Sequence, residues 1–250
     1  MPSVLPPLVL LPGTLCDERV FAPLLASLHP HFAEPLSTTV ILTAHHTSMR
    51  AAAEHVLSLA PPRFALLGFS LGGILALEVA LLAPDRVRGL ALLSVNAAPA
   101  PLSTHAARRA AVLQAQSMGY EHYLRKHLWP NYVAQAAQDN MALRHLLLEM
   151  AQHLGHGAFF TQTEAAITRR DYRPLLPTLT MPALVQAGEH DAITSPAAQQ
   201  ETANALANAI FTCIPDAGHF ALLEQQDAVA MSVAAWFHIV RSVPTDQGEQ

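Results

Sequence analysis

The chain has 250 residues, of which 51% are hydrophobic and only 13% are charged, and this supply of apolar side chains excludes a largely disordered protein. The formal net charge of −5 gives no support to nucleic-acid binding. No apolar run reaches the roughly 20 residues that a membrane-spanning helix needs.

Short apolar runs alternate with amphipathic stretches along the first hundred residues. The N-terminal residues, MPSVLPPLVLLPG, contain no basic region and no small-residue cleavage site, so they predict a strand at 8–12 rather than a signal peptide. Further strands are predicted at 38–42, 64–68 and 88–95, and helices at 47–62 and 71–83. This alternation is typical of an α/β fold with a parallel sheet.

The alternation stops after about residue 97 and resumes near 178. Apolar residues between these points recur at helical spacing, which predicts helices at 104–130, 131–155 and 157–170 and no strand. Beyond them the sequence predicts strands at 182–188 and 210–215, a final helix at 226–240 and a frayed tail, PTDQGEQ. It also predicts a helix at 195–209 with Ser195 as its N-cap and Pro196 at its first position.

An insertion of this length divides the chain into two parts. Residues 1–97 and 178–250 are predicted to form the α/β core, and residues 98–177 a helical cap, or lid, over the carboxyl ends of the strands. The cap has eight basic and five acidic side chains, a net charge of +3, against −8 for the core. A basic lid on an acidic core would steer an anionic substrate or an acidic partner, although a solvated helical surface without a partner has the same composition.

Cysteine and histidine usage gives no sign of a disulfide framework or a metal site. Cys16 and Cys213 are far apart, and Cys213, in AIFTCIP, is predicted to lie in a buried strand. They read as two unpaired, reduced thiols of a cytoplasmic protein. His45 and His46 are adjacent in a predicted loop with no third ligand at metal spacing.

The stretch GFSLG places a serine, Ser70, between a predicted strand and a predicted helix. A strand that turns into a helix within one or two residues holds this serine in a strained conformation, and Gly68 and Gly72 leave the space that the turn needs. The hydroxyl is then exposed above the sheet. This context makes Ser70 the candidate nucleophile.

A serine hydroxyl needs a base and an orienting acid. Asp191 follows the strand that ends near Gly188, and His219 follows the strand that ends near Pro215. The chain order serine, acid, histidine and the position of each residue just after a strand are typical of one hydrolase arrangement. Glu189 and His190 are interpreted as residues that shape the loop, and Asp216 as too close in sequence to orient His219.

Two backbone N–H groups are predicted to stabilise the oxyanion. One belongs to Leu71, directly after the serine, and the other to the loop LLPGTLCD, where Thr14 is the first candidate and Leu15 the second.

The pieces LLPGTLCD, GFSLGG, GEHDAIT and DAGHFALLEQ span the whole core and resemble the α/β-hydrolase superfamily, in particular small cap-bearing serine esterases of bacteria. That branch includes carboxylesterases and pimeloyl-carrier-protein methyl esterases. The resemblance implies an α/β-hydrolase fold with an inserted cap, and ester hydrolysis through an acyl-enzyme without a metal or a cofactor. Two departures are the Pro12-Gly13 pair in place of the usual His-Gly, and a chain that begins at what the family counts as its third strand.

Apolar side chains near these loops predict an acyl pocket for esters of short to medium chain length. They are Leu15, Phe69, Trp129, Phe159, Phe160 and Phe220. The expected partner is a small-molecule ester, and the basic cap would also suit an acyl carrier protein.

Several alternatives stay open. A thioesterase, amidase, lactonase or C–C hydrolase uses the same three side chains, and a non-catalytic ligand receptor can share the fold. A haloalkane dehalogenase or epoxide hydrolase would need an aspartate at position 70. A dinucleotide-binding protein is excluded because LPGTLC lacks the third glycine and the later acid of that motif.

Overall fold

A parallel sheet lies at the centre of the structure, a computed structural model that describes residues 5–155 and 157–243. Within these residues six strands pair in the order β2-β1-β3-β4-β5-β6, all parallel. They are β1 (Leu8–Leu11), β2 (Thr38–Val40), β3 (Phe64–Phe69), β4 (Val87–Leu93), β5 (Ala183–Gly188) and β6 (Ala209–Ile214). Each predicted strand is present, and the predicted α/β class is confirmed.

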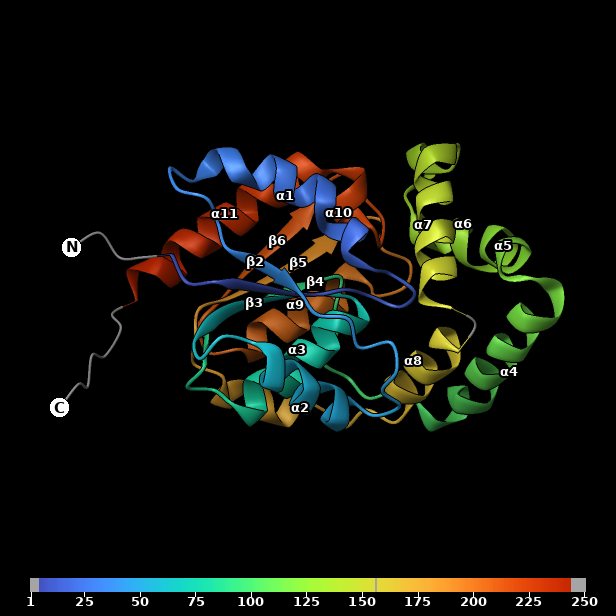
Figure 1. The fold of residues 1–250 in the computed structure, drawn as a ribbon, viewed down its shortest axis with the longest axis horizontal. Coiled ribbons are helices and arrows are strands. Elements are labelled where there is room, and N and C mark those ends of the chain that lie inside the picture. Colours follow the sequence, from blue (N-terminus) through green and yellow to red (C-terminus); the bar gives the residue numbers. More distant parts are fainter. Residues whose placement is uncertain (1–4, 156, 244–250) are drawn as a thin grey trace.

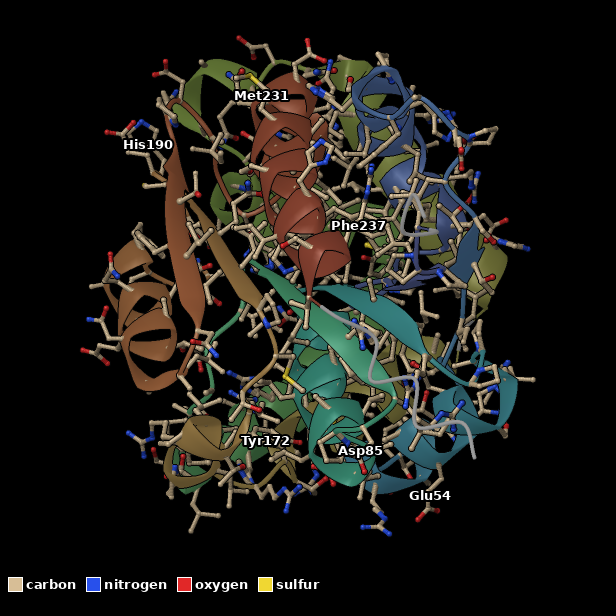
Figure 2. The ribbon with its side chains drawn as sticks, turned by 90° about the vertical axis from the view of Figure 1, so that its left-hand side faces the viewer. Glu54, Asp85, Tyr172, His190, Met231 and Phe237 are labelled. Carbon is tan, nitrogen blue, oxygen red and sulfur yellow. The ribbon has the colours of Figure 1, made fainter. Side chains whose placement is uncertain are left out.

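Helices cover both faces of the sheet (Figure 1). One face is covered by α1 (Ala22–Leu28), α10 (Ala221–Glu224) and α11 (Gln226–Ser242), and the other by α2 (Met49–Leu59), α3 (Leu71–Leu82) and α9 (Pro196–Ala205). A parallel strand between two such layers is buried on both sides, which explains the continuous apolar run of β1, where every residue is fully buried. On α11, Phe237 is buried, while Met231 is 65% exposed (Figure 2).

Further helices lie between β4 and β5 in the chain. They are α4 (Leu102–Met118), α5 (Tyr120–Tyr123), α6 (Trp129–Tyr132), α7 (Met141–Leu154) and α8 (Ala158–Ile167). Figure 1 shows them together at one end of the molecule. We call residues 98–177 the inserted segment, and its described residues form no strand, as the sequence predicted. None of the helices described anywhere in the chain has the length and apolar character required to cross a membrane.

Local signals account for where the helices begin. Ser195 caps α9 by accepting a hydrogen bond from the Ala198 N–H at 3.3 Å, and Pro196 occupies the first helical position, so both predictions are confirmed. Ser48 caps α2 in the same way, through the Ala51 N–H at 3.2 Å.

Two predicted helices of the inserted segment are broken where the sequence prediction continued them. The helix predicted at 104–130 ends at Met118, because Gly119 adopts a φ of +83° that ends α4. A π-helical turn, η3 (Leu124–Leu128), then leads into α6. The helix predicted at 131–155 begins only at Met141, after Asn140 has capped it.

Helix α1 and the short turns were not predicted. Helix α1 has only seven residues and a proline in its first turn, so it carries too little helical periodicity to be recognised. The 3₁₀ turns are η1 (Glu18–Phe21), η2 (His29–His31), η4 (Gln135–Ala137) and η5 (Arg173–Thr178). The predicted frayed tail, residues 244–250, lies outside the described residues.

The prediction that Cys213 is buried is wrong. Cys213 is exposed because β6 is the last strand of the sheet, and only part of its surface is covered. Cys16, by contrast, is buried, and this burial raises the pKa of its thiol far above the usual range.

This difference predicts the reactivity of the two thiols. One equivalent of a disulfide reagent such as Ellman's reagent is expected to react with the native protein, at Cys213, and two equivalents after unfolding in urea. The variant Cys213→Ser is expected to lose the native reaction completely. A fast native reaction that persists in this variant would show that Cys16 is accessible.

Candidate active site

Ser70 lies between β3 and α3 in a conformation that few residues adopt. Its φ is +51° and its ψ is −117°, and it is one of the few non-glycine residues with a positive φ in the described chain. The turn requires glycine on either side: a Cβ on Gly68 would overlap the backbone of the first turn of α3, and one on Gly72 would overlap the Leu11 carbonyl oxygen. Strain of this kind is typical of functional residues.

Ser70, His219 and Asp191 form a hydrogen-bonded chain. The Ser70 Oγ lies 2.8 Å from His219 Nε2, and His219 Nδ1 lies 2.9 Å from Asp191 Oδ2 and 3.0 Å from Oδ1. Because a carboxylate only accepts, Nδ1 donates its proton to Asp191, and Nε2 is left as the acceptor for the serine O–H. The acid and the imidazole are almost completely buried, at 4% and 3% exposed.

The order of the strands explains why these three residues meet. Ser70 follows β3, Asp191 follows β5 and His219 follows β6, and the carboxyl ends of parallel strands lie at one edge of a sheet. The loops after β5 and β6 are joined directly, since the His190 N–H donates to the Ala217 carbonyl oxygen at 2.8 Å. The structure therefore brings together all three predicted side chains.

The Asp191 carboxylate is held by further donors. Oδ1 accepts hydrogen bonds from the Ile193 and Thr194 N–H groups, both at 2.9 Å. The amide nitrogen of Gln199, a fully buried residue of α9, donates to Oδ2 at 3.2 Å. These donors fix the carboxylate in place and stabilise its charge. Gln199 was not predicted, because no sequence pattern connects a helix amide to an acid in the preceding loop.

Two other residues fix the histidine loop. The Ser94 hydroxyl, at the end of β4, donates to the His219 carbonyl oxygen at 2.8 Å. The Glu224 carboxylate accepts from the Gly218 N–H at 3.0 Å and from the Ala134 N–H of the inserted segment at 2.7 Å. Burial raises the pKa of Glu224 in spite of these donors. Neither residue was predicted from the sequence.

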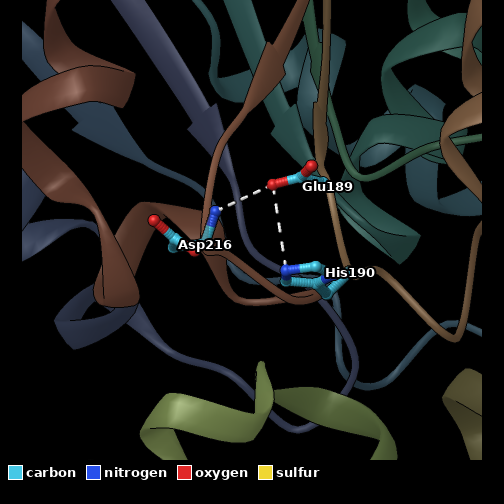
Figure 3. A group of neighbouring side chains, drawn as sticks. All are labelled: Glu189, His190 and Asp216. Atoms are coloured by element: carbon cyan, nitrogen blue, oxygen red, sulfur yellow. Dashed lines mark hydrogen bonds and ion pairs between the residues drawn. The ribbon is translucent and has the colours of Figure 1, made fainter.

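The acids that lie nearest to Asp191 and His219 in sequence take no part in the hydrogen-bonded chain of Ser70, His219 and Asp191. Glu189, His190 and Asp216 lie together on the surface (Figure 3), where the Asp216 N–H donates to Glu189 Oε2 at 3.2 Å and His190 Nε2 lies 3.8 Å from the same oxygen. Their ligand atoms are within 4.8 Å of one another, but all three side chains are exposed. Exposed acidic groups at this spacing are common without a metal ion. The hydrogen bond from the Asp216 N–H to Glu189 joins the two loops.

The turn after β1 faces the serine. Thr14 and Ser70 line the same cavity. The Leu15 N–H donates to the Gln162 side-chain oxygen at 2.9 Å, so this second candidate for the oxyanion is already occupied. Leu71 is the first residue of α3, and the N–H groups of a first helical turn have no partner within the helix.

A cavity of about 290 Å³ opens at the Ser70 hydroxyl, between the core and the inserted segment. Of the six predicted pocket residues, Phe69, Phe159 and Phe220 line it. The remaining lining includes Tyr132 and Gln162, which belong to the segments HLWPNY and GAFFTQ that also supplied predicted pocket residues. It also includes residues that the sequence prediction missed: Arg108, Ala111, Tyr123, Leu128, Thr163, Ala166 and Ile193.

The other three predicted pocket residues lie elsewhere. Trp129 is buried in the hydrophobic core, and its indole N–H donates to the Gln138 carbonyl oxygen at 2.9 Å. Phe160 is 48% exposed. Leu15 lines a second cavity of about 250 Å³, between α4, α7 and α8. Phe159 lines both cavities and forms part of the wall between them.

Together, the parallel sheet, the strained serine turn and the hydrogen-bonded side chains define an α/β hydrolase. Residues 8–232 match the model of a family described as the alpha/beta hydrolase family, and the chain belongs to this family. The predicted fold and enzyme class, an α/β-hydrolase fold and a carboxylic ester hydrolase, are confirmed by this match and the relatives below.

Several curated relatives are similar over nearly their whole length. A pimeloyl-[acyl-carrier protein] methyl ester esterase from Stenotrophomonas maltophilia is 32% identical, with 98% of this chain and 96% of the relative covered. One with the same name from Xylella fastidiosa is 29% identical, with 96% of each covered. Among solved structures, a thermophilic esterase from Thermogutta terrifontis has a TM-score of 0.82 at 23% identity, covering 94% of this chain and 90% of its own. The last likeness concerns the fold alone.

Proposed function

We propose that the protein is a serine esterase in which Ser70 is the nucleophile, His219 the general base and Asp191 the residue that orients the imidazole. The hydrogen-bonded chain from serine to acid carries this proposal. The Ser70 Oγ forms a bond to the ester carbonyl carbon while its proton moves to His219 Nε2. The alcohol then leaves with that proton, and a water molecule repeats the sequence to release the acid from the acyl-enzyme.

The oxyanion of each tetrahedral intermediate is stabilised by the N–H groups of Thr14 and Leu71. The Leu71 N–H, in the first turn of α3, has no hydrogen-bond partner within the helix. Thr14 lines the same cavity as the serine. The Leu15 N–H is excluded from this role by its bond to Gln162. Each such donor contributes about 10²- to 10³-fold to the rate.

The cavity supports an ester of short to medium acyl chain length. A volume of about 290 Å³ accommodates roughly ten non-hydrogen atoms, if each takes the ~30 Å³ of a water molecule. Its aromatic walls, with Phe69, Phe159 and Phe220 among them, favour an apolar chain over a polar one.

The inserted segment acts as the lid of this site, with residues 1–97 and 178–250 as the core. This division is supported by the lining of the cavity, to which both parts contribute: Phe69 and Phe220 come from the core, and Phe159 from α8. Substrate selection therefore depends on the helices of the inserted segment.

A second candidate substrate is the methyl ester of an acyl chain carried on an acyl carrier protein. The names of the curated relatives favour it, and so does Arg108, which lines the cavity. Among residues 5–155 and 157–243 no acid forms an ion pair with Arg108. Burial and the nearby charge of Arg108 lower the pKa of Arg169 to about 10. The Arg108 guanidinium at the cavity would attract a phosphate or a carboxylate.

Two substrate series distinguish these candidates. The first is p-nitrophenyl esters from acetate to decanoate, for which we expect many turnovers and an optimum at an intermediate length. The second compares one methyl ester as a free molecule and linked through phosphopantetheine to a carrier protein. If the carrier-linked ester is the substrate, its kcat/KM exceeds that of the free ester. Arg108→Gln then lowers the kcat/KM of the carrier-linked ester and leaves that of the free ester unchanged.

The same measurements test the remaining alternatives. A thioesterase, amidase, lactonase or C–C hydrolase would cleave a thioester, amide, lactone or C–C bond, respectively, faster than the ester of the same acyl group. A receptor would release at most one equivalent of p-nitrophenol. The cytoplasmic location that the two unpaired cysteines favour stays part of this proposal, and cell fractionation tests it.

Phe159 is expected to limit the chain length of the substrate. The variant Phe159→Ala would join the two cavities, so kcat/KM for the octanoate and decanoate esters should rise at least threefold relative to the butanoate ester. The neighbouring Phe160→Ala removes an exposed ring and serves as the control with an unchanged profile. An identical profile for the two variants would contradict this role of Phe159.

A further inference from the structure

The turn that carries Thr14 has an unusual backbone. The Cys16 N–H donates to the Gly13 carbonyl oxygen at 3.1 Å, which closes a four-residue turn, and Leu15 at its third position has a φ of +57°. A positive φ at this position is typical of a type II turn, in which glycine or asparagine is preferred. For leucine it costs about 1–2 kcal/mol, so another interaction must hold the turn in this form.

That interaction comes from the inserted segment. The Gln162 side-chain oxygen, on α8, accepts the hydrogen bond from the Leu15 N–H at 2.9 Å, and Gln162 is only 6% exposed. This N–H belongs to the central peptide of the turn, the peptide that points in opposite directions in type I and type II turns. Helix α8 is itself fixed to the core, because the Thr161 hydroxyl donates to the Ala44 carbonyl oxygen.

The end of the same loop is tied to α7. Asp17 is fully buried, and its Oδ2 lies 2.8 Å from His153 Nδ1. Arg19 donates to the Asp17 carboxylate through two guanidinium nitrogens and also lies 3.5 Å from Glu149 Oε2 of α7. Two helices of the inserted segment therefore hold the loop after β1 at two separate points.

We infer that Gln162 is a positioning residue for the oxyanion hole. Its carbonyl oxygen selects the type II form of the turn, and this fixes the conformation of Thr14, whose carbonyl oxygen shares the central peptide with the Leu15 N–H. Without this acceptor, the Leu15 N–H is buried and unpaired, which costs about 1–3 kcal/mol and favours rotation of the central peptide. The inference rests on the proposed function, because it assumes that Thr14 provides an oxyanion donor.

This role of Gln162 couples the lid to the chemistry. The oxyanion turn keeps this form only while α8 is packed on the core, so a displaced lid would leave Ser70 and His219 in place beside a turn that no longer holds Thr14 fixed. Loss of Gln162 should accordingly lower the reaction rate more than it lowers substrate binding.

Two variants of Gln162 test this role. Gln162→Met keeps the length and volume of the side chain but removes the carbonyl acceptor, whereas Gln162→Glu keeps an acceptor oxygen at the same atom. For p-nitrophenyl butanoate we expect kcat to fall by about 10- to 100-fold in the Met variant, with KM changed less than threefold, and to recover at least partly in the Glu variant. A trifluoromethyl ketone, which forms an oxyanion on the serine, should lose affinity for the Met variant by a similar factor.

Three results would overturn the inference: an unchanged kcat and inhibitor affinity in Gln162→Met, an equal loss in both variants, or a change confined to KM. Thermal unfolding of each variant separates a loss of fold from a loss of positioning. Failure of the proposed function is distinguishable, because the unmodified protein would then show no turnover that the substitution Ser70→Ala abolishes.

Discussion

Replacement of Asp191 with asparagine is expected to lower kcat by about 10⁴-fold while the protein stays folded. The Ile193 and Thr194 N–H groups both donate to Oδ1, so the oxygen of the new amide takes that position and its nitrogen the position of Oδ2. There the NH₂ group faces His219 Nδ1 at 2.9 Å and favours the tautomer that carries its proton on Nε2. That nitrogen can no longer accept the Ser70 proton. Steady-state hydrolysis of a p-nitrophenyl ester measures the effect.

Asp216→Asn is the matched control. Asp216 is closer to His219 in sequence, but its side chain is exposed and lies beside Glu189 and His190 (Figure 3). The kcat of Asp216→Asn should stay within about twofold of the kcat of the unmodified protein. A loss in Asp216→Asn as large as that in Asp191→Asn, or a loss below tenfold in the latter, would contradict the assignment of the acid.

Among substitutions that add a methyl group to a glycine near the site, Gly72→Ala is expected to cause the largest loss of stability. A Cβ at this position would overlap the Leu11 carbonyl oxygen at the end of β1, and a backbone atom cannot move aside as a flexible side chain can. We expect the free energy of unfolding to fall by about 3 kcal/mol or more and the melting temperature by roughly 6–12 °C. Urea and thermal unfolding followed by circular dichroism measure both.

Gly157→Ala controls for the effect of adding a methyl group to a glycine. Its added Cβ would meet no atom within 4 Å, so its stability should change by no more than about 1 kcal/mol. If Gly72→Ala is as stable as Gly157→Ala, the close approach of α3 to β1 is not as the structure describes it.

The positions of Ser70, Asp191 and His219 were predictable because each follows an apolar run that ends abruptly. A strand buried on both faces leaves a continuous apolar sequence, and a parallel sheet brings the ends of all its strands to one edge. Sequence order alone then places the three residues close together.

The supporting contacts had no such signal. Gln162, Gln199 and Glu224 act across 147, 8 and 6 residues respectively through single amide or carboxylate groups, and their spacing to their partners follows no regular period. Only the packing of α8, α9 and α10 on the core creates these contacts.

The pocket prediction failed where the direction of a side chain mattered. Phe159 and Phe160 are consecutive residues of a helix, so they point about 100° apart, and only one can line the cavity. Trp129 was assigned to the pocket on its aromatic character alone, whereas α6 directs it into the core. The orientation of these short helices depends on the breaks at Gly119 and Asn140, which the sequence prediction did not place.

The assignment of Ser70 as the nucleophile is tested by steady-state hydrolysis of p-nitrophenyl butanoate with the unmodified protein and with Ser70→Ala, at equal concentrations and after both are shown to be folded. We expect many turnovers for the unmodified protein and a loss of about 10⁴-fold or more in kcat for the variant. Hydrolysis by Ser70→Ala within tenfold of the unmodified rate would contradict this assignment, because the reaction would then not pass through an acyl group on this serine.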